Sequence, residues 1–391
     1  MKDMETIVAA LPRIREAARG MQEIVLANLV AIGEVAAPRG QEAARVRMFL
    51  ERGAECGLQS ASADGAGNGL ALLPGREGRS NILLFSNVDT LAETPAEPSL
   101  VFRADEIVGP FLGDNSLALA VMVSLPILLD RLDLRLNANV VVLGAVRMLG
   151  RGNLEGLTSF LASDSLPIRY GLSLESVQLG RLNYACLGLL LCELKVRLPD
   201  DYNWVQFGAT GSIIVMNDVI SRINAIPLPR RPLTSIVFGM IRGGVSSRNI
   251  ARETTLRFEV RSESAELLDK VSGQIEDIAE DVAANSGVDI RFDVFARRAP
   301  GGLDIAHPLV RQARRVQAAL DIPSQLYPTT FALTSLLERN IPALVLGLTT
   351  GKRQGALAEM EEAVALDPLW TGLAQVVGLL LALDGGCCDV A

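Results

Sequence analysis

Apolar and polar positions alternate along the chain in a pattern that predicts helices between buried strands. Residues 1–20 and 40–56 show the apolar spacing of amphipathic helices. Continuous apolar runs at 79–90, 138–149 and 341–348 are typical of strands that are buried on both faces. Because helices alternate with such strands, the pattern predicts an α/β domain whose sheet is covered by helices.

Residues 113–132 predict a helix with a well-marked start. Asp114 or Asn115 stands directly before its apolar stripe. Short polar side chains of this kind accept hydrogen bonds from the first free N–H groups of a helix. We therefore expect one of these two residues to be the N-cap.

The pattern changes near residue 188 and returns to its first form near residue 298. The elements predicted between these positions are strands at 189–199, 235–244, 254–264 and 289–297, and helices at 208–227 and 265–287. Their order, βαββαβ, closes as one sheet with two helices. We therefore predict an inserted domain at 188–297, within a discontinuous α/β domain formed by 1–187 and 298–391.

The bulk properties narrow the class of protein. A chain of 391 residues favours two domains. Its net charge of −8 argues against nucleic acid and membrane surfaces as partners. The most apolar run, 184–196, contains Glu193 and Lys195 and is too short to span a bilayer. Residues 1–20 lack the pattern of a secretion signal, and the five cysteines are scattered, so we expect a cytoplasmic protein.

Several short motifs follow one another in a characteristic order. They are NVDT at 87–90, GDNSLALA at 113–120, GRGNLEG at 150–156, LESVQLGR at 174–181, GGVSSRN at 243–249, VRSES at 260–264, HPLV at 307–310 and IPALVLGL at 341–348. In these motifs the chain resembles the M20 family of metallopeptidases and aminoacylases, over nearly its whole length. The resemblance implies a zinc-exopeptidase-like mixed sheet flanked by helices, an inserted lid and dimerisation domain, and a homodimer.

The same resemblance implies two zinc ions, held by imidazole and carboxylate ligands and served by a glutamate base. Three carboxylate positions of that site survive as Asp89, Asp114 and Glu175. One histidine ligand is replaced by Asn87, which is also a candidate contact for a substrate.

The remaining positions of the implied zinc site carry residues that cannot bind zinc or act as a base. The glutamate pair that contains the base falls on Met148 and Leu149, and the last histidine ligand falls at about Ala358. The one histidine of the chain, His307, matches a helix start away from the metals. We therefore expect no zinc and no other cofactor. Two alternatives stay open: a different alignment with other ligands, and a Mg²⁺ or Mn²⁺ site made of the surviving carboxylates.

Residues that hold the substrate in the family are partly retained. Asn249 and Arg261 match the positions that bind a substrate carboxylate, and an arginine fork suits two carboxylate oxygens. A surface salt bridge is the alternative for Arg261. Tyr202 stands where the family's lid carries a histidine, either as a hydrogen-bond donor to substrate or as an ordinary lid residue.

Three further residues are candidates near the former metal cavity. Arg147 replaces a small residue, and it either neutralises the surviving carboxylates or points to solvent. Thr330 lies in a segment where Phe331 replaces a polar residue, and it is a candidate substrate contact. Gly351 flanks the loop on the substrate side, although turn formation explains it equally well.

Three functions therefore compete. The first is metal-independent acid–base chemistry on an amino-acid- or peptide-derived carboxylate, with Asp89, Asp114 and Glu175 in one pocket. The second is a non-catalytic binding protein or partner subunit, and the third is a residual hydrolase with an unusual metal. An enzyme should present the carboxylates to an open pocket, whereas a scaffold should fill that pocket with Met148, Leu149 and Phe331.

Overall fold

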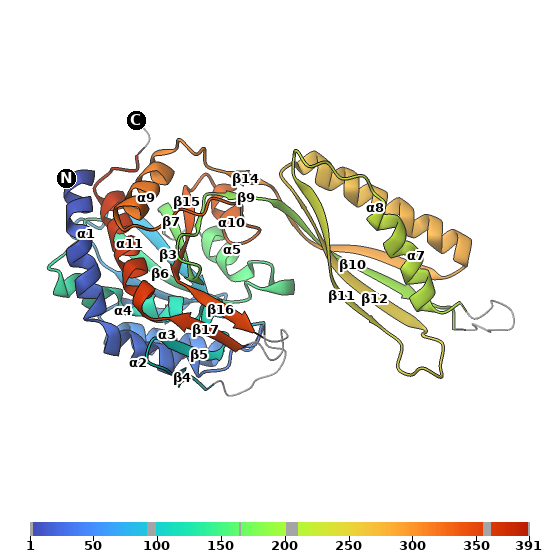
Figure 1. The fold of residues 1–391 in the computed structure, drawn as a ribbon, viewed down its shortest axis with the longest axis horizontal. Coiled ribbons are helices and arrows are strands. Elements are labelled where there is room, and N and C mark those ends of the chain that lie inside the picture. Colours follow the sequence, from blue (N-terminus) through green and yellow to red (C-terminus); the bar gives the residue numbers. More distant parts are fainter. Residues whose placement is uncertain (1–2, 92–98, 164–165, 201–209, 355–360, 390–391) are drawn as a thin grey trace. The chain divides into compact units, whose positions relative to one another are not determined.

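The computed structural model describes residues 3–91, 99–163, 166–200, 210–354 and 361–389, with only the backbone at 114, 353, 354 and 361. The chain divides into two compact units (Figure 1). The larger unit is formed by Met1–Ala185 and Gly302–Ala391, and the smaller unit by Cys186–Gly301.

A seven-stranded mixed sheet organises the larger unit, in the order β1-β2-β6-β3-β7-β15-β8. Strands β6, β3, β7 and β15 run parallel, and the outer strands pair antiparallel. The strands are β1 (Gln59–Ala63), β2 (Gly69–Leu73), β6 (Asn139–Ala145), β3 (Asn81–Asn87), β7 (Ile168–Val177), β15 (Ala343–Thr349) and β8 (Leu182–Asn183).

Helices cover both faces of this sheet, as the buried apolar strands predict (Figure 1). Along β3, Ile82 and Leu84 enter one core, while Leu83 and Phe85 enter a second core on the opposite face. The first core is closed by α1 (Met4–Arg19), α2 (Gln22–Gly33), α3 (Ala43–Glu55), α4 (Leu117–Arg131), α9 (Pro308–Ala319) and α11 (Asp367–Asp384). The second is closed by α5 (Glu155–Ala162) and α10 (Leu333–Leu337).

A second, antiparallel sheet of the larger unit has the order β16-β17-β5-β4. Its strands are β16 (Gly351–Gln354), β17 (Glu361–Ala365), β5 (Glu106–Pro110) and β4 (Val101–Phe102). Strand β16 begins two residues after β15 ends. This sheet therefore lies at the carboxyl end of a central parallel strand.

The smaller unit has the predicted order βαββαβ. It consists of β10 (Gly188–Arg197), α7 (Ser212–Asn224), β11 (Thr234–Gly243), β12 (Glu253–Ser262), α8 (Ala265–Ser286) and β13 (Asp289–Arg298). The strands pair antiparallel in the order β11-β12-β10-β13. Both helices pack on one face of the sheet, against alternate residues such as Leu190, Leu194, Leu256 and Phe258.

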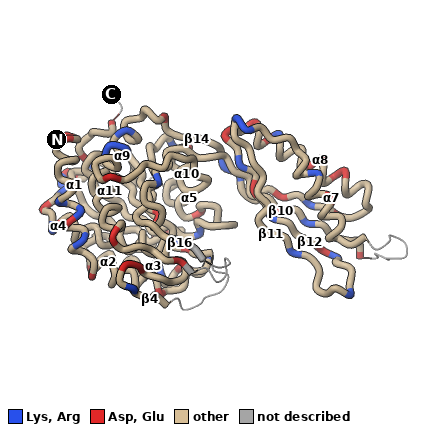
Figure 2. Tube along the Cα trace, viewed as in Figure 1, with Lys and Arg blue, Asp and Glu red and all other residues tan. Residues whose placement is uncertain are grey.

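The opposite face of this sheet, which we call the open face, carries charged residues of both signs. Figure 2 shows basic and acidic positions interspersed along its strands. The predicted class, mixed α/β with an inserted βαββαβ unit, is confirmed. Within the described ranges, no helix combines the length and the apolar character needed to cross a bilayer.

Candidate functional site

The carboxyl ends of the parallel strands in the larger unit surround a cavity of about 520 Å³. Loops that follow such strands are the usual ligand-binding side of an α/β sheet. The cavity is lined by Gly113, Leu149, Glu175, Val177, Gln178, Arg181, Thr329, Phe331, Gly351, Lys352, Glu362, Ala363 and Val364. We call it the strand-end cavity.

A chain of side-chain amides connects β3 with β7 beside this cavity. The Asn115 amide nitrogen donates to the Asn87 side-chain oxygen at 2.5 Å and to a Glu175 carboxylate oxygen at 3.2 Å. The Asn115 oxygen accepts from the backbone N–H of Ser176 at 3.0 Å. Asn87 in turn donates to the carbonyl of Asp89 at 2.9 Å. Asn87 is therefore buried and committed to internal bonds, which does not fit its predicted role as a substrate contact.

The start of α4 differs from the prediction. A π-helical turn at Leu112–Ser116 precedes α4, and neither N-cap residue, Phe111 or Ser116, makes a side-chain capping hydrogen bond. The expectation that Asn115 is the N-cap is wrong, because its amide spans the gap between β3 and β7 instead. The backbone of Asp114 lies in the same turn, but its side chain lies outside the described residues.

Arg181 supplies the positive charge beside Glu175. One guanidinium nitrogen lies 3.7 Å from a Glu175 carboxylate oxygen, and Nε donates to the Tyr327 hydroxyl at 3.0 Å. The Glu175 side chain is 14% exposed and lines the cavity. Arg181 was not predicted as a site residue, although it belongs to the LESVQLGR motif.

Arg147 does not take this place. Its guanidinium donates to the Ala66 carbonyl at 2.8 Å and forms an ion pair with Glu155 at 2.8 Å. Arg147 has a left-handed backbone (φ 49°), and it lines a different cavity, together with Asp64 and Phe160. The expectation that Arg147 neutralises the surviving carboxylates is wrong, because Glu155 at the start of α5 already pairs with it.

Asp89 lies behind the cavity and is fully buried. One carboxylate oxygen accepts from the Leu149 backbone N–H at 2.8 Å, and the other has no hydrogen-bond partner among the residues that the structure describes. Burial, with a smaller contribution from the charge of Glu42, raises the pKa of Asp89 to about 6. Asp89 thus differs from Glu175, which meets the cavity directly.

A second carboxylate at the cavity was not predicted. Glu362 on β17 is buried, lines the cavity and accepts a hydrogen bond from the backbone N–H of Gly113. Lys352 on β16 also lines it, with an exposed side chain. Glu362 reaches the cavity because β17 pairs with β5, which lies more than 240 residues earlier in the sequence. No local sequence pattern predicts this pairing.

The remaining candidates of the larger unit have mixed placements. Thr330 is half-buried and is not among the lining residues, whereas its neighbours Thr329 and Phe331 are. Gly351 lines the cavity, and a Cβ there would lie 2.6 Å from Val177 and 2.9 Å from the Ala363 carbonyl. Close packing therefore explains this glycine. Of the predicted apolar fillers, Met148 is in the core, while Leu149 and Phe331 line the cavity.

The two residues of the expected carboxylate clamp lie far apart in the smaller unit. Asn249 is in the loop before β12, and Arg261 is near the end of that strand. The eight residue steps from Glu253 to Arg261 alone span roughly 26 Å at about 3.3 Å per residue. Both Nε and a terminal nitrogen of Arg261 bond to one oxygen of Glu259, at 2.8 and 2.6 Å. A joint clamp on one carboxylate within one chain is therefore excluded, and Tyr202 lies outside the described residues.

The donors at the strand-end cavity do not fit the zinc pair that the resemblance implies. Two amides, Asn87 and Asn115, stand among the carboxylates, and amide oxygens are poor substitutes for imidazole at zinc. His307 accepts from the Leu309 backbone at the start of α9 and does not line the cavity. In the part of the chain that is described, no three His, Cys, Asp or Glu side chains are grouped to hold a metal.

Comparisons with known proteins agree with this architecture. A family model described as the peptidase dimerisation domain, M20_dimer, matches residues 206–287. A search of curated proteins finds no match.

Solved structures match over almost the whole chain. The dipeptidase Dug1p of Saccharomyces cerevisiae has a TM-score of 0.76 at 13% identity, covering 96% of this chain and 99% of its own. A tripeptidase of Staphylococcus aureus has a TM-score of 0.74 at 16% identity, covering 93% and 98%. A dinuclear metal-binding peptidase of the M20 family from Bacillus subtilis has a TM-score of 0.59 at 13% identity, covering 96% and 98%.

Proposed function

We propose that this chain, which has the fold of the M20 peptidases and a match to their dimerisation domain, binds an amino-acid- or peptide-derived carboxylate in the strand-end cavity without zinc-dependent hydrolysis. The observation that carries the proposal is the pairing of Glu175 with Asn115 and Arg181. An amide and a guanidinium then satisfy a carboxylate that would otherwise face a metal.

The cavity has the size and charge for such a ligand. Its volume of about 520 Å³ lies within the usual range for small-molecule sites, roughly 300–1,000 Å³. Arg181 and Lys352 are suited to the ligand's carboxylate, and Glu175 and Glu362 to an ammonium or amide N–H. Val177, Val364 and Phe331 supply apolar contact area.

Acid–base chemistry on the bound ligand is the second candidate function. Glu175 favours it, because this carboxylate lines the cavity. The buried Asp89 does not reach the ligand, so any proton transfer is assigned to Glu175 alone among the predicted carboxylates that are described. Ligand binding without turnover remains the leading proposal.

Ligand binding is tested by thermal shift with N-acetyl amino acids, short peptides and their methyl esters. We expect free acids to stabilise the wild type and esters to have little effect. Lys352→Met should lower affinity about tenfold, the magnitude of one charge-assisted hydrogen bond. Arg261→Met is the matched control in the smaller unit. A loss of binding in Arg261→Met with Lys352→Met unchanged would overturn the proposed cavity.

Two further measurements separate hydrolysis from binding. Elemental analysis of protein purified without chelator should give far less than one zinc per chain. If a ligand is turned over, Glu175→Gln should abolish turnover while binding remains. Stoichiometric zinc, with activity that a chelator removes, would overturn the metal-free proposal.

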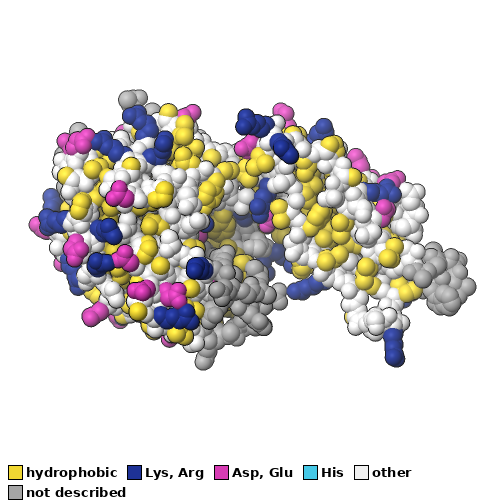
Figure 3. All heavy atoms as spheres, in the orientation of Figure 1, with side chains coloured by type: hydrophobic (Ala, Val, Ile, Leu, Met, Phe, Trp, Pro, Cys, Tyr) yellow, Lys and Arg dark blue, Asp and Glu magenta, His cyan; other side chains and the backbone are white. Residues whose placement is uncertain are grey.

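We also propose that the smaller unit, which contains the predicted lid and dimerisation domain at 188–297, forms a homodimer through its edge strand β11. Its other edge strand, β13, carries alternating charges such as Asp289, Arg291 and Asp293, which discourage edge pairing. Exposed apolar side chains occur on and near β11 and α7, and Figure 3 shows apolar groups on this unit's surface. They include Ile213, Ile214, Ile241 and Val245, at 46%, 59%, 54% and 95% exposure.

Sedimentation at micromolar concentration tests this interface. The wild type should be a dimer, and Ile214→Lys with Ile241→Lys should be monomeric without loss of fold, because both side chains are already exposed. Val101→Lys, at a residue 51% exposed in the larger unit, is the control. We keep cytoplasm as the proposed compartment.

A further inference from the structure

Arg181 lies at the strand-end cavity with its guanidinium only partly committed to other residues. Its Nε donates to the Tyr327 hydroxyl at 3.0 Å, and one terminal nitrogen lies 3.7 Å from Glu175, beyond hydrogen-bond range. The two terminal nitrogens donate no hydrogen bond to any residue that the structure describes. Because Arg181 lines the cavity and its side chain is 26% exposed, their N–H groups remain for a ligand or for water.

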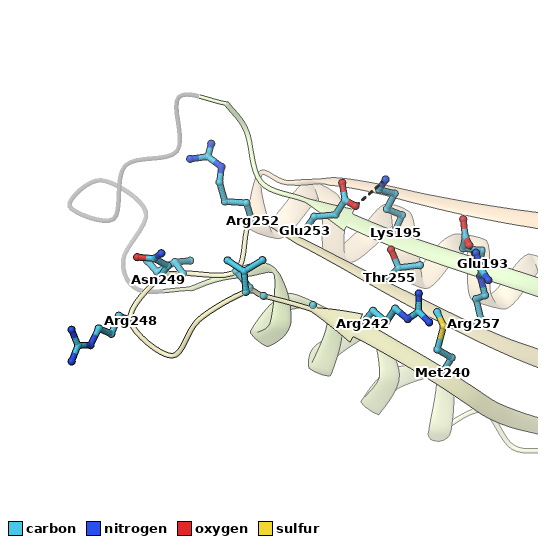
Figure 4. Close-up of a pocket in the computed structure, with 15 residues that line it drawn as sticks. Glu193, Lys195, Met240, Arg242, Arg248, Asn249, Arg252, Glu253, Thr255 and Arg257 are labelled. Carbon is cyan, nitrogen blue, oxygen red and sulfur yellow. Dashed lines mark hydrogen bonds and ion pairs between the residues drawn. The ribbon is translucent and has the colours of Figure 1, made fainter. Parts of the chain in front are cut away.

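Arginines of the smaller unit are bound differently. Figure 4 shows Glu193 and Arg257 side by side on the open face, where they are 2.7 Å apart. Arg261 lies 2.6 Å from Glu259. These distances are within hydrogen-bond range, so both guanidinium groups already bind a carboxylate directly. The wider separation at Arg181 is therefore a feature of the strand-end cavity and is not shared by these arginine–glutamate pairs.

Backbone contacts hold Tyr327 in place. The segment that contains it runs alongside residues 180–183, where Arg181 and Gln325 form a parallel β-bridge and the Gln325 N–H donates to the Gly180 carbonyl at 2.7 Å. The side-chain amide of Asn183, which is buried, donates to the Tyr327 carbonyl at 2.6 Å. The Tyr327 hydroxyl thus projects from a backbone that is already fixed, and it restricts the Arg181 side chain before any ligand binds.

The hydrogen bond from Nε decides how a carboxylate can approach Arg181. A guanidinium binds two carboxylate oxygens either through Nε and one terminal nitrogen or through both terminal nitrogens. Because Tyr327 occupies Nε, only the second arrangement remains. A carboxylate bound in this way lies next to Glu175, since one of the two terminal nitrogens is 3.7 Å from that side chain.

Glu175 then determines which carboxylates fit. Two carboxylates beside one guanidinium repel each other. A hydrogen-bond donor on the ligand's α-carbon offsets this repulsion, because it donates to Glu175 while the ligand's carboxylate accepts from Arg181. A carboxylate side chain can accept several hydrogen bonds, so this contact adds to the bond that Glu175 accepts from Asn115.

We propose that Tyr327 positions Arg181 so that both terminal nitrogens bind the ligand's carboxylate, and that Glu175 accepts from an N–H or O–H group on the ligand's α-carbon. The preferred ligands are therefore α-amino, α-amido and α-hydroxy carboxylates, rather than carboxylates without a donor at that position. Tyr327 is not among the lining residues, so it is a positioning residue that acts through Arg181. This inference rests on the proposed function, since it concerns the same cavity.

Calorimetric titration of the full chain with mandelate and with phenylacetate tests the ligand class, because the two acids differ only in an α-hydroxyl. We expect the better-bound enantiomer of mandelate to bind about tenfold more tightly than phenylacetate, the magnitude of one hydrogen bond to a charged group. Equal binding of both acids, or binding of N-acetyl amino acids but of neither acid, overturns the inference and leaves the proposed function intact. No binding of any of these ligands overturns both.

A variant at Glu175 identifies the acceptor of the α-hydroxyl. Glu175→Met should bring the ratio of the two affinities close to one, because that acceptor is gone. Phenylacetate should bind this variant at least as tightly as the wild type, which also shows that the variant is folded. A preference for mandelate that survives in Glu175→Met contradicts the inference.

Tyr327→Phe tests the positioning role. It should weaken mandelate binding severalfold in the wild type and have no further effect in Arg181→Met, because the hydroxyl acts only through the guanidinium. Tyr184→Phe removes the hydroxyl of a tyrosine that does not line the cavity, and it should bind mandelate as the wild type does. The inference fails if Tyr327→Phe weakens binding equally in both backgrounds, or if it matches Tyr184→Phe.

Discussion

Polar groups gather in two regions of this molecule, the strand ends of the larger unit and the open face of the smaller unit, but their surroundings differ. At the strand ends, Asp89, Asn87 and Asn115 are buried, and Glu175 is 14% exposed. On the open face, the paired side chains of Lys195 and Glu253 are 42% and 48% exposed. In the first region, side-chain amides join neighbouring strands. In the second region, ion pairs join them.

This difference in burial decides what each region contributes. A buried polar group that loses its partner keeps its full desolvation cost, whereas an exposed one regains water. The strand-end residues therefore maintain the fold around the cavity as well as shaping it. Substitutions of exposed open-face residues should therefore have little effect on folding.

The largest expected effect that tests this contrast is at Asn115. Asn115→Leu removes the partner of the Asn87 oxygen, one partner of Glu175 and the acceptor of the Ser176 N–H. We expect a loss of about 3–5 kcal/mol in the free energy of unfolding. Thr255→Val on the open face should change it by about 0.5 kcal/mol or less. Denaturant unfolding of both variants measures the contrast, and equal losses would contradict it.

The next effect is a pH dependence at Asp89, whose pKa is raised from 3.8 to about 6 in the folded protein. Below pH 4, Asp89 is protonated in both the folded and the unfolded state, so it does not make stability depend on pH. Between pH 4 and 6 the unfolded state ionises first, so stability falls as pH rises, by up to about 3 kcal/mol. Asp89→Asn removes this term, so its stability relative to the wild type should rise over that interval. Denaturant unfolding at pH 4 and 7 measures it, and a constant difference would show that Asp89 ionises normally.

The smallest effect compares two arginine–glutamate pairs. Arg181→Met removes the guanidinium beside the largely buried Glu175 and should cost about 1–2 kcal/mol. Arg261→Met breaks the Arg261–Glu259 pair, whose side chains are 36% and 35% exposed, and should cost less than about 1 kcal/mol. Thermal unfolding measures both losses. A larger loss for Arg261→Met would show that the exposure of a pair does not determine how much it contributes to stability.

Much of the fold could be predicted from local sequence patterns. Apolar runs identified the central strands, and the change of pattern near 188 identified the βαββαβ unit, because periodicity reports which face of an element is buried. The sequence also shows that a chain with one histidine cannot supply the several imidazoles that the M20 resemblance implies.

The partners of individual side chains were decided by tertiary structure alone. Arg147 and Arg181 are both arginines near site motifs, yet only Arg181 lies beside Glu175, because the left-handed turn at Arg147 directs its guanidinium to Glu155. Asn115 has the sequence context of a helix cap, but its amide joins β3 to β7 instead. Pairing between elements distant in sequence also brings Glu362 to the cavity. Such contacts depend on the packing of several elements at once, which no local pattern encodes, whereas the class of each element follows from its own residues.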